Sequence, residues 1–472
     1  MIEAVRDALG DEPAWIVGGA VRDRLLGRRG AGEDVDLAVE RDPRAAARRI
    51  ARAAGGAAFE LSDVFGGWRV VGPGQAWQVD VTPLQGGTLE ADLAARDLTV
   101  NAIAEPLRGG ALVDPYGGQA DLAARRLRMV SAAAFAADPL RTLRGARLAC
   151  ELGFAVEPAT AAAAREHAAG LANVSQERVF AELKRILVAD TALAGLATMD
   201  DLGQHDRGQP EVVLPELDAL RGVEQNPYHH RDVYGHTLEV LEATIALERD
   251  PAAILGDEVA GGVRALLAEP LADGLTRGGG LRLGALLHDA AKPQTRVELP
   301  GGRIGFPRHD VDGAALARET LTRLRASERT RAYVAALTRH HLRLGFLVHE
   351  APLDRRTIYR YLRDTEPVSA DVTLLSVADR LATRGRKADE AIARHVALAR
   401  DMLAVALAER AAGPRAPLVR GDVLARAVGI APGPRLGELL DAIAEARFAG
   451  EVRTEEEAVA LARGLLGADE AV

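Results

Sequence analysis

The front part of the chain, up to about Phe135, alternates short apolar runs with helical stretches. Residues 15–17 (WIV) precede two glycines and a helical pattern, which predicts a strand, a glycine turn and a helix. Further strand-like runs are VDLAVE (35–40), WRVVG (68–72) and WQVDVTP (77–83), and PRAAARRIARAAG (43–55) has helical spacing. The alternation predicts a small mixed sheet packed with helices.

Beyond residue 137 the pattern becomes helical. Ala, Leu and Arg recur at helical spacing over 138–223, and a second helical region extends to about residue 385. We expect loops to interrupt that second region at TRGGG (276–280) and PGGRIGFPRH (300–309). The fold class predicted is an α+β multidomain protein. Its expected parts are a mixed-sheet head over 1–137, an all-α neck and body over 138–225, an all-α domain over 226–385 and a helical extension over 386–472.

Composition narrows the class of protein. The chain has 472 residues, of which 48% are hydrophobic and 27% charged, so it is globular and not disordered. It has no apolar run of membrane-spanning length and no basic segment before an apolar core at its N-terminus. Its one cysteine, Cys150, excludes an intramolecular disulfide and a Cys-based zinc cluster. We expect a cytoplasmic protein without a membrane partner.

Charge and histidine are unevenly distributed along the chain. The net charge of −9 argues at first sight against a nucleic-acid partner, yet six Arg and only two Asp lie between residues 121 and 148. No histidine occurs before His167, whereas eight of the eleven lie between His229 and His349. Chemistry in the front part must therefore use carboxylates and arginines, while the middle part can build an imidazole metal site.

Two aspartates two residues apart dominate the front part. In a strand, side chains alternate, so Asp34 and Asp36 project from one face and repel each other unless a cation neutralises them. Asp80, in the run WQVDV, is a candidate third ligand. On its own, such a pair is more often a solvated strand edge.

The segment before these aspartates favours a cation site over a solvated strand edge. Gly18 and Gly19 lie at a predicted strand-to-helix turn, where backbone N–H groups can approach a phosphate. Arg22 lies in the first helical turn and can bind the same triphosphate. Together, the turn and the aspartates indicate a nucleotide triphosphate held over divalent cations.

The sequence resembles a known family at these motifs. VGGAVRDRLLG (17–27) followed by DVDLAVE (34–40) resembles the bacterial class II tRNA nucleotidyltransferase and poly(A) polymerase family of the polymerase β-like superfamily. Four later segments resemble its other motifs in order: RDLTVNAI (96–103), DPYGG (114–118), DPLRTLRGAR (138–147) and SQER (175–178). The motifs together extend from Val17 to Arg178.

The resemblance implies roles for individual residues. Asp34 and Asp36 would bind catalytic Mg²⁺, with Asp80 as a further ligand that helps to deprotonate the attacking hydroxyl. The nucleotide-binding residues implied are Gly18, Gly19, Arg22, Arg96, Asp138, Arg141 and Arg144. Three positions depart from the family pattern, namely Ala95, Ala137 and Gln85. None of them removes a metal-binding or base-reading residue.

Asp138 and Arg141 would select the base. A carboxylate accepts from the exocyclic amino group that CTP and ATP share, and Arg donates to ring acceptors. UTP and GTP lack that amino group. The spacing of three residues predicts that Asp138 and Arg141 lie on one face of a helix.

The middle part carries a second set of candidate ligands. His236, the His288–Asp289 pair and Asp379 are spaced as in the HD phosphohydrolase signature, which the segment resembles. His309 and His341 match further positions of two-metal members, so a divalent transition metal is expected there. We assign His229, His230, His340 and His349 to the surface or to a supporting layer. Lys292 could contact a substrate phosphate.

Arginines beside the predicted base-reading helix are candidate RNA contacts. Arg125, Arg126, Arg128 and Arg147 would grip backbone phosphates of the tRNA acceptor end without reading its sequence. Solvation of helix faces explains any single one of them equally well. The predicted partners are tRNA, CTP and ATP, and no DNA.

The resemblance implies template-independent addition of CMP and AMP to the 3′ end of tRNA, which is CCA addition. Poly(A) polymerase, and enzymes that add only CC or only A, share every motif and stay open as alternatives. A third possibility is an HD phosphohydrolase whose front half binds RNA. An alarmone synthetase–hydrolase is disfavoured because its HD domain comes first and its synthetase motifs are absent here.

Overall fold

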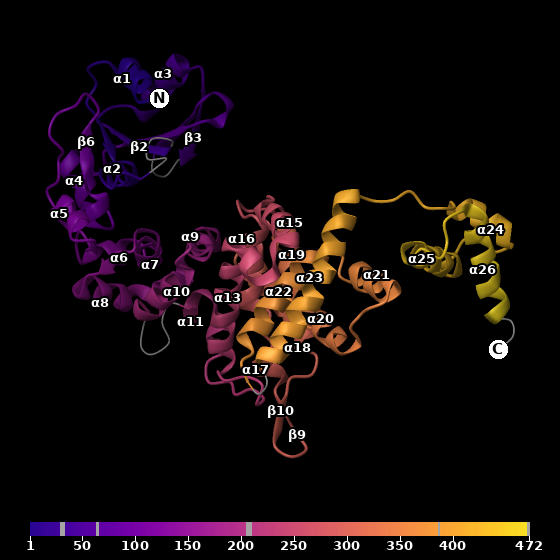
Figure 1. The fold of residues 1–472 in the computed structure, drawn as a ribbon. Helices are drawn as coiled ribbons and strands as arrows, with labels where there is room; N and C mark the ends of the chain where they lie inside the picture. The colour runs from indigo at the N-terminus through magenta and orange to yellow at the C-terminus, as the bar shows by residue number, and fades with distance from the viewer. Residues whose placement is uncertain (29–33, 63–65, 204–209, 386–387, 470–472) are drawn as a thin grey trace. The chain divides into compact units, whose positions relative to one another are not determined.

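The computed structural model describes residues 1–28, 34–62, 66–203, 210–385 and 388–469 (Figure 1). The chain divides into two compact units, residues 1–214 and 215–472. The first contains a mixed sheet followed by helices, and the second is helical apart from one hairpin. The predicted α+β class is confirmed.

The sheet of the first unit has six strands in the order β3-β4-β5-β2-β1-β6. Neighbouring strands are antiparallel except β2 and β5, which are parallel, so the sheet is mixed as predicted. The strands are β1 (Ala14–Val17), β2 (Asp34–Val39), β3 (Ala57–Ser62), β4 (Gly67–Val71), β5 (Gln78–Pro83) and β6 (Ala104–Pro106).

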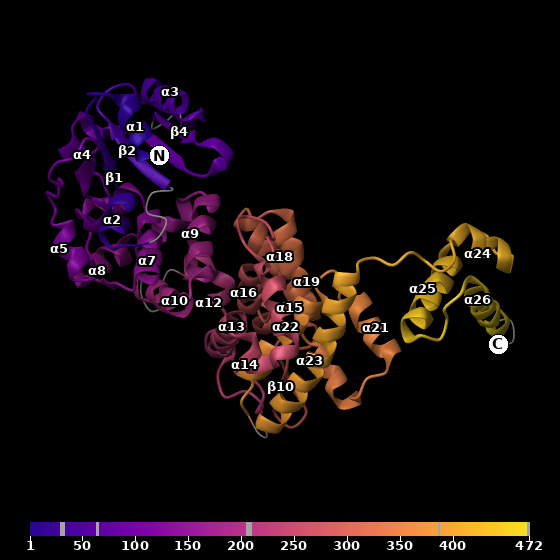
Figure 2. The ribbon, with the colours of Figure 1, turned by 45° about the horizontal axis from the view of Figure 1, so that its top comes forward.

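Two amphipathic helices cover one face of this sheet (Figure 2). They are α1 (Ile2–Leu9) and α3 (Pro43–Ala54), and their apolar side chains form one core with Val35 and Leu37 of β2. Because side chains alternate along a strand, burial of Val35 and Leu37 on this face turns Asp34 and Asp36 to the other face.

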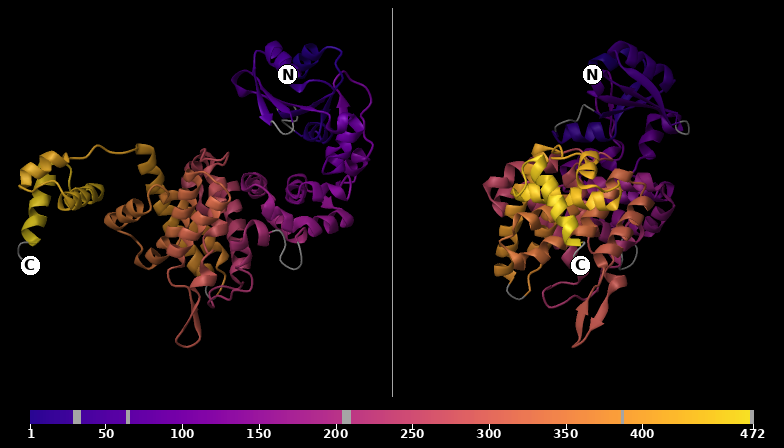
Figure 3. Two further views of the ribbon diagram at one scale, coloured as in Figure 1. Left: turned by 180° about the vertical axis from the view of Figure 1, so that it is seen from behind. Right: turned by 90° about the vertical axis from the view of Figure 1, so that its right-hand side faces the viewer.

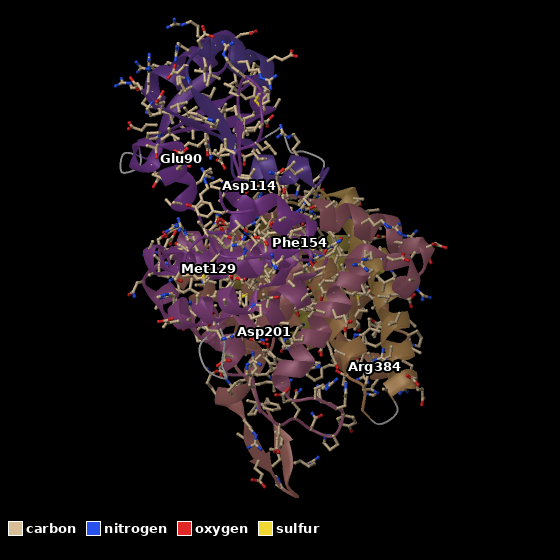
Figure 4. All side chains as sticks on the ribbon, turned by 90° about the vertical axis from the view of Figure 1, so that its left-hand side faces the viewer. Glu90, Asp114, Met129, Phe154, Asp201 and Arg384 are labelled. Carbon is tan, nitrogen blue, oxygen red and sulfur yellow. The ribbon has the colours of Figure 1, made fainter. Side chains whose placement is uncertain are left out.

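The rest of the first unit is helical. Phe154 joins the core of the sheet, and the backbone N–H of Met129 donates to Thr160, so both residues (labelled in Figure 4) tie the sheet to the helices. A two-residue pair, β7 (Arg126–Leu127) and β8 (Ala155–Val156), lies at the same junction. The helices are α2 (Gly19–Leu25), α4 (Leu89–Ala94), α5 (Gly118–Ala123), α6 (Ala133–Ala137), α7 (Leu140–Leu152), α8 (Pro158–His167), α9 (Gln176–Val188), α10 (Ala192–Asp201) and α11 (Pro210–Val213).

The second unit packs its helices around α16 (Arg277–Leu287), in which every residue is buried. The others before the tail are α12 (Pro215–Asp218), α13 (Val233–Arg249), α14 (Pro251–Leu255), α15 (Asp257–Ala268), α17 (Lys292–Thr295), α18 (His309–Arg323), α19 (Glu328–His340), α20 (Arg343–Leu347), α21 (Arg355–Asp364), α22 (Ser369–Ala382) and α23 (Ala388–Ala412).

The loop predicted at residues 276–280 is wrong, because these residues begin α16. The Thr276 side chain caps the helix by accepting from the Gly279 backbone N–H. The glycines admit close neighbours: a Cβ at Gly280 would lie 2.6 Å from Leu271, and one at Gly284 would lie 2.6 Å from Leu337. Packing therefore outweighs the low helix propensity of glycine.

The loop predicted at residues 300–309 is also wrong in part. Residues 297–305 form the hairpin β9 (Val297–Leu299) and β10 (Arg303–Gly305), which projects from the helices (Figure 3). Gly301 and Gly302 both have positive φ and make the turn. Helix α18 begins at His309, shortly after the hairpin.

The tail contains α24 (Gly421–Val428), α25 (Pro434–Ala449) and α26 (Glu455–Asp469), which share a core of their own. Helix α25 packs against α21, where Arg360 donates to Glu445 over 2.6 Å. Among the described residues, no helix combines the length and apolar character needed to cross a membrane.

Candidate functional sites

The three candidate carboxylates of the first unit lie in adjacent register on the sheet. Asp36 of β2 pairs with Asp80 of β5, and Asp34 lies two residues before Asp36 on the same strand. Directly paired residues project from the same face, so the three side chains converge on the face opposite α1 and α3. The placement expected for Asp34 and Asp36 is thus found.

Arg69 holds Asp80 in place. Arg69 lies opposite Asp80 on β4, and its Nε and Nη2 donate to the two carboxylate oxygens, each over 2.7 Å. The sequence analysis missed Arg69, although an Arg and an Asp on consecutive strand-like runs are a signal for such a pair. The fork leaves each oxygen of Asp80 with a free lone pair for a further partner.

The carboxyl group of Asp36 has a raised pKa. Desolvation on this face of the sheet raises its pKa to about 6, and the charges of Asp80 and Asp34 add to the rise, while Arg96 opposes it. A divalent cation would offset both the desolvation and the repulsion. Carboxylate oxygens are the donors that Mg²⁺ takes in proteins, so Asp34, Asp36 and Asp80 fit this ion.

The glycine turn lies against these carboxylates. Gly18 has φ 72°, and a Cβ there would lie 3.0 Å from Arg96 Nη1 and 3.2 Å from Asp36 Oδ2. Glycine is therefore required both by the backbone and by the space. Arg96, held by Asp92 over 2.9 Å, brings its guanidinium to the same place.

Arg22 and Arg144 are tied to the protein by a chain of hydrogen bonds. Arg22 is buried; its Nη1 donates to Asn101 over 2.7 Å and its Nε to Asp23 over 2.9 Å. Asn101 donates to Asp97, which also accepts from Arg144 over 3.0 Å. Burial tends to raise the pKa of Asp97, but Arg144 and Asn101 outweigh it and hold the pKa well below its usual range. Asp97 and Asn101 were not among the predicted site residues.

Asp138 and Arg141 are placed differently from the prediction. Asp138 precedes α7, with extended φ and ψ of −149° and 99°, so the two residues do not share a helix. The following proline disfavours a helical Asp138, whose Oδ1 accepts from the Leu140 N–H instead. Its Oδ2 accepts from Arg178 over 2.6 Å, and Arg141 donates to the Ala95 carbonyl over 2.7 Å.

The four arginines predicted to contact RNA differ in exposure. Arg126 and Arg128 are partly exposed and both donate to the fully buried Asp121. Arg125 is exposed and lies over the ring of Phe154. The prediction that Arg147 contacts RNA is wrong. Arg147 is buried and pairs with Glu182 and Glu151, so it has a structural role inside the helices.

The six candidate ligands of the second unit come together from five helices or their ends. Asp289 lies at the centre: its Oδ2 is 3.1 Å from His288 Nε2 and 3.8 Å from His236 Nε2. Its Oδ1 is 3.5 Å from His309 Nε2 and 3.9 Å from His341 Nε2. Asp379 Oδ1 is 3.1 Å from His236 Nε2. Two ligand groups therefore share Asp289.

Hydrogen bonds fix the orientation of three of the imidazoles. The Nδ1 atoms of His288, His309 and His341 each donate to the backbone carbonyl three residues earlier, over 2.6–2.8 Å. Donation from Nδ1 leaves the Nε2 lone pair of a neutral imidazole facing the carboxylate.

Several atoms at this centre have no hydrogen-bond partner. Both oxygens of Asp289 and the Nε2 atoms of His236, His288 and His309 are buried and make no hydrogen bond, and their close contacts are ion pairs within the cluster and with Lys292. Two opposed sets of acceptors need a cation between them, and the mixed imidazole and carboxylate set fits a divalent transition metal.

Residues beside this cluster extend it. Lys292 Nζ is 2.6 Å from Asp289 Oδ2 and donates to Gln225 over 2.7 Å. His229, assigned from sequence to the surface or a supporting layer, packs its ring 4.9 Å from that of His236. Burial, helped by Lys292, lowers the pKa of His229 to about 3. The spacing of seven residues between His229 and His236 was the sequence signal that could have placed His229 beside this cluster.

Three family models match the chain. They describe a poly A polymerase head domain (residues 14–85 and 73–128), a "probable RNA and SrmB- binding site of polymerase A" (153–220) and an HD domain (233–384). Asp34, Asp36 and Asp80 lie within the matched head-domain segments, and the six candidate ligands of the second unit lie within the matched HD segment.

Curated relatives match over nearly the whole chain. An A-adding tRNA nucleotidyltransferase of Deinococcus radiodurans is 40% identical over 94% of this chain and 94% of its own length. A CC-adding tRNA nucleotidyltransferase of Thermus thermophilus is 36% identical over 94% and 92%. The chain belongs to the tRNA nucleotidyltransferase family with a poly A polymerase head and an HD domain, which confirms the resemblance seen in the motifs.

Solved structures share the fold. A CCA-adding enzyme with CTP has a TM-score of 0.61 at 19% identity, covering 98% of this chain and 94% of the other. The same enzyme type with ATP has a TM-score of 0.61 at 20% identity, with the same coverage.

Proposed function

We propose that the protein transfers CMP and AMP from CTP and ATP to the 3′ end of tRNA. The observation that carries this proposal is the convergence of Asp34, Asp36 and Asp80 beside the Gly18 turn. The names of its family relatives, which add CC or A to tRNA, support the choice of substrate.

Each part of the first unit has a task in this reaction. Divalent cations bound by Asp34 and Asp36 would activate the 3′ hydroxyl and stabilise the leaving pyrophosphate. The Gly18 turn lets the triphosphate approach the backbone, and Arg96 binds its negative charge. Arg69 keeps the carboxylate of Asp80 oriented toward the hydroxyl.

The test uses tRNA transcripts that end before the first C, after one C and after both, each with labelled CTP, ATP, UTP or GTP. We expect incorporation of C into the first two transcripts and of A into the third, in the CCA order. Unlimited addition of A to general RNA would overturn the proposal in favour of a poly(A) polymerase. An Asp34→Asn, Asp36→Asn double variant should add nothing.

A narrower product is a second candidate. The relatives that align over 94% of this chain are named for adding only A or only CC, whereas the multifunctional CCA proteins align over about four fifths of it or less. An A-adding enzyme would extend only the transcript that ends after both C residues, and a CC-adding enzyme would extend only the other two. Extension of all three transcripts to complete CCA would exclude it.

We also propose a metal-dependent phosphohydrolase activity for the second unit. The buried imidazole and carboxylate atoms that converge on Asp289 without hydrogen bonds support a bound transition metal, and Lys292, which is ion-paired with Asp289, supplies a cation for a phosphate. Metal analysis of the purified protein tests the first point, and phosphate release from nucleotide phosphoesters tests the second. A metal-free protein without hydrolytic activity, also after addition of Mn²⁺, Co²⁺ or Ni²⁺, would contradict this proposal.

The tRNA acceptor end is proposed to lie along the neck and body, residues 138–225, together with the exposed Arg125, Arg126 and Arg128. The match at residues 153–220 supports this placement. Each of these arginines replaced by Ala should weaken tRNA binding and reduce its salt dependence.

A further inference from the structure

We propose that Arg178 is a specificity-determining residue of the nucleotide addition reaction. It would position the carboxylate of Asp138 to accept from the amino group of the incoming base. The inference rests on the proposed function and deepens it, because it names a residue of α9 that neither the motifs nor the family matches assign to base selection.

Asp138 is held at both of its oxygens. Oδ1 accepts from the Leu140 backbone N–H over 3.2 Å, and Oδ2 accepts from Arg178 Nη2 over 2.6 Å. The first contact comes from the next residues of the chain, whereas the second comes from a different helix, 40 residues further on. Arg178 therefore fixes the direction of the carboxylate relative to α9.

Arg141, the other base-reading candidate, is positioned in another way. Its Nη2 donates to the Ala95 carbonyl over 2.7 Å and its Nη1 to the Ala134 carbonyl over 3.2 Å. Both acceptors are backbone atoms, so a side-chain substitution nearby leaves them in place. The contact at Oδ2 of Asp138, by contrast, depends on one replaceable side chain, that of Arg178.

The chemistry of selection requires a directed carboxylate. A carboxylate oxygen carries two lone pairs, so Oδ2 can accept from Arg178 and from a base amino group together. The 4-amino group of cytosine and the 6-amino group of adenine are donors there, whereas the O4 of uracil is an acceptor and is repelled. Asp138 is about a quarter exposed, and without Arg178 its carboxylate can rotate toward water.

Loss of Arg178 should therefore reduce discrimination more than it reduces catalysis as a whole. We expect Arg178→Ala to lower kcat/KM about tenfold for the nucleotide that wild type incorporates, the scale of one charge-assisted hydrogen bond. For the matched nucleotide that lacks the amino group, UTP or purine riboside triphosphate, we expect kcat/KM to change by no more than about twofold. Arg178→Lys keeps the positive charge but lacks the planar guanidinium group, so its kcat/KM should lie between those of wild type and Arg178→Ala.

The experiment measures the ratio of kcat/KM for CTP over UTP, and for ATP over purine riboside triphosphate, on truncated tRNA. Arg185→Ala is the matched control, because Arg185 lies on the same helix, is similarly exposed and pairs with Glu151 away from Asp138. We expect Arg178→Ala to lower the ratio and Arg185→Ala to leave it unchanged. Thermal melting verifies that each variant is folded.

A double-mutant cycle separates positioning from a merely structural role. If Arg178 acts through Asp138, Arg178→Ala has no further effect on the ratio in an Asp138→Ala background. Equal losses for both members of a nucleotide pair, or additive effects with Asp138→Ala, would overturn the inference. Failure of the wild-type protein to incorporate any nucleotide would instead overturn the proposed function.

Discussion

The two candidate metal centres differ in how their clustered charged groups are neutralised. In the first unit, arginines of the protein partner the carboxylates: Arg69 pairs with Asp80, and Arg96 opposes the rise in the pKa of Asp36. In the second unit, imidazole and carboxylate acceptors face each other at Asp289, and Lys292 is the one lysine or arginine among the described residues that pairs with it.

This difference teaches what each centre needs a cation for. The sheet site holds its shape through strand register and arginine, so a cation there serves the reaction. The helical site brings together buried imidazole and carboxylate groups from five segments, several of whose atoms make no hydrogen bond, so a cation bound there would also stabilise the fold. The following predictions test that contrast.

The largest expected effect is the loss of nucleotide addition in Asp36→Asn. Removing one charged ligand should lower kcat by at least about 10³-fold, because the cations at this site stabilise both oxygens of the displacement. A His288→Ala, Asp289→Ala variant should add nucleotides within about threefold of wild type. Single-turnover assays with both variants measure the rate of nucleotide addition. A comparable loss in the His288→Ala, Asp289→Ala variant would contradict separate roles for the two centres.

Removal of transition metal should destabilise the second unit selectively. If a metal is bound at about 100 times its dissociation constant, chelation removes about 2.7 kcal/mol of stability. We expect faster hydrogen exchange in α13, α16 and α22 after chelation, with the sheet of the first unit unchanged. His288→Ala should remove the response, and uniform loss of protection in both units would contradict the prediction.

The pH dependence of Mg²⁺ binding should identify Asp36. Its pKa is raised from 3.8 to about 6, so the folded protein holds a proton that the unfolded chain releases between about pH 4 and 6. This group's contribution to the free energy of unfolding is therefore fully present below about pH 4 and falls as pH rises through that window.

Mg²⁺ competes with that proton, so the Mg²⁺ concentration for half-maximal nucleotide addition should rise about tenfold per pH unit below about pH 6. Measurement of Mg²⁺-induced changes in melting temperature between pH 5 and 8 gives the same window without an activity assay. In Asp36→Asn the pH dependence should disappear, and its persistence would assign it to another group.

The smallest effect expected is that of Gly18→Ala. Gly18 has φ 72° and ψ −135°, a conformation that costs an alanine about 1–3 kcal/mol, and a Cβ there would press on Arg96 and Asp36. Nucleotide addition should fall about tenfold. Gly27→Ala is the matched control, because Gly27 also has positive φ, 65°, but nothing lies within 4 Å of its Cβ position. We expect Gly27→Ala to lose similar stability while keeping its nucleotide-addition activity. Equal activity in the two variants would contradict the need for glycine beside Arg96 and Asp36.

The sequence predicted what depends on local alternation and on motif spacing. Strand periodicity was enough to place Asp34 and Asp36 on one face, and the resemblance to the HD signature was enough to name six candidate ligands that the structure brings together. Register between strands is not a local property, so Arg69 was missed although it pairs with Asp80.

The errors have a common physical origin in tertiary context. Arg147 is spaced like an exposed helix residue, but Glu182 of α9 accepts its guanidinium in the interior. Asp138 was placed in a helix by counting three residues to Arg141, whereas Pro139 keeps it extended. The Thr276–Gly280 segment has loop composition, yet its neighbours need the space that a glycine helix leaves.

The glycines of α16 reverse a common rule of protein engineering. Exchanging glycine for alanine inside a helix usually raises stability, and it would do so at Gly261 of α15, where nothing lies within 4 Å of the added carbon. At Gly280 and Gly284 the same exchange would force α16 away from Leu271 and Leu337. Since His288 and Asp289 follow directly at its end, an alanine at either glycine of α16 would also disturb the placement of these two candidate ligands.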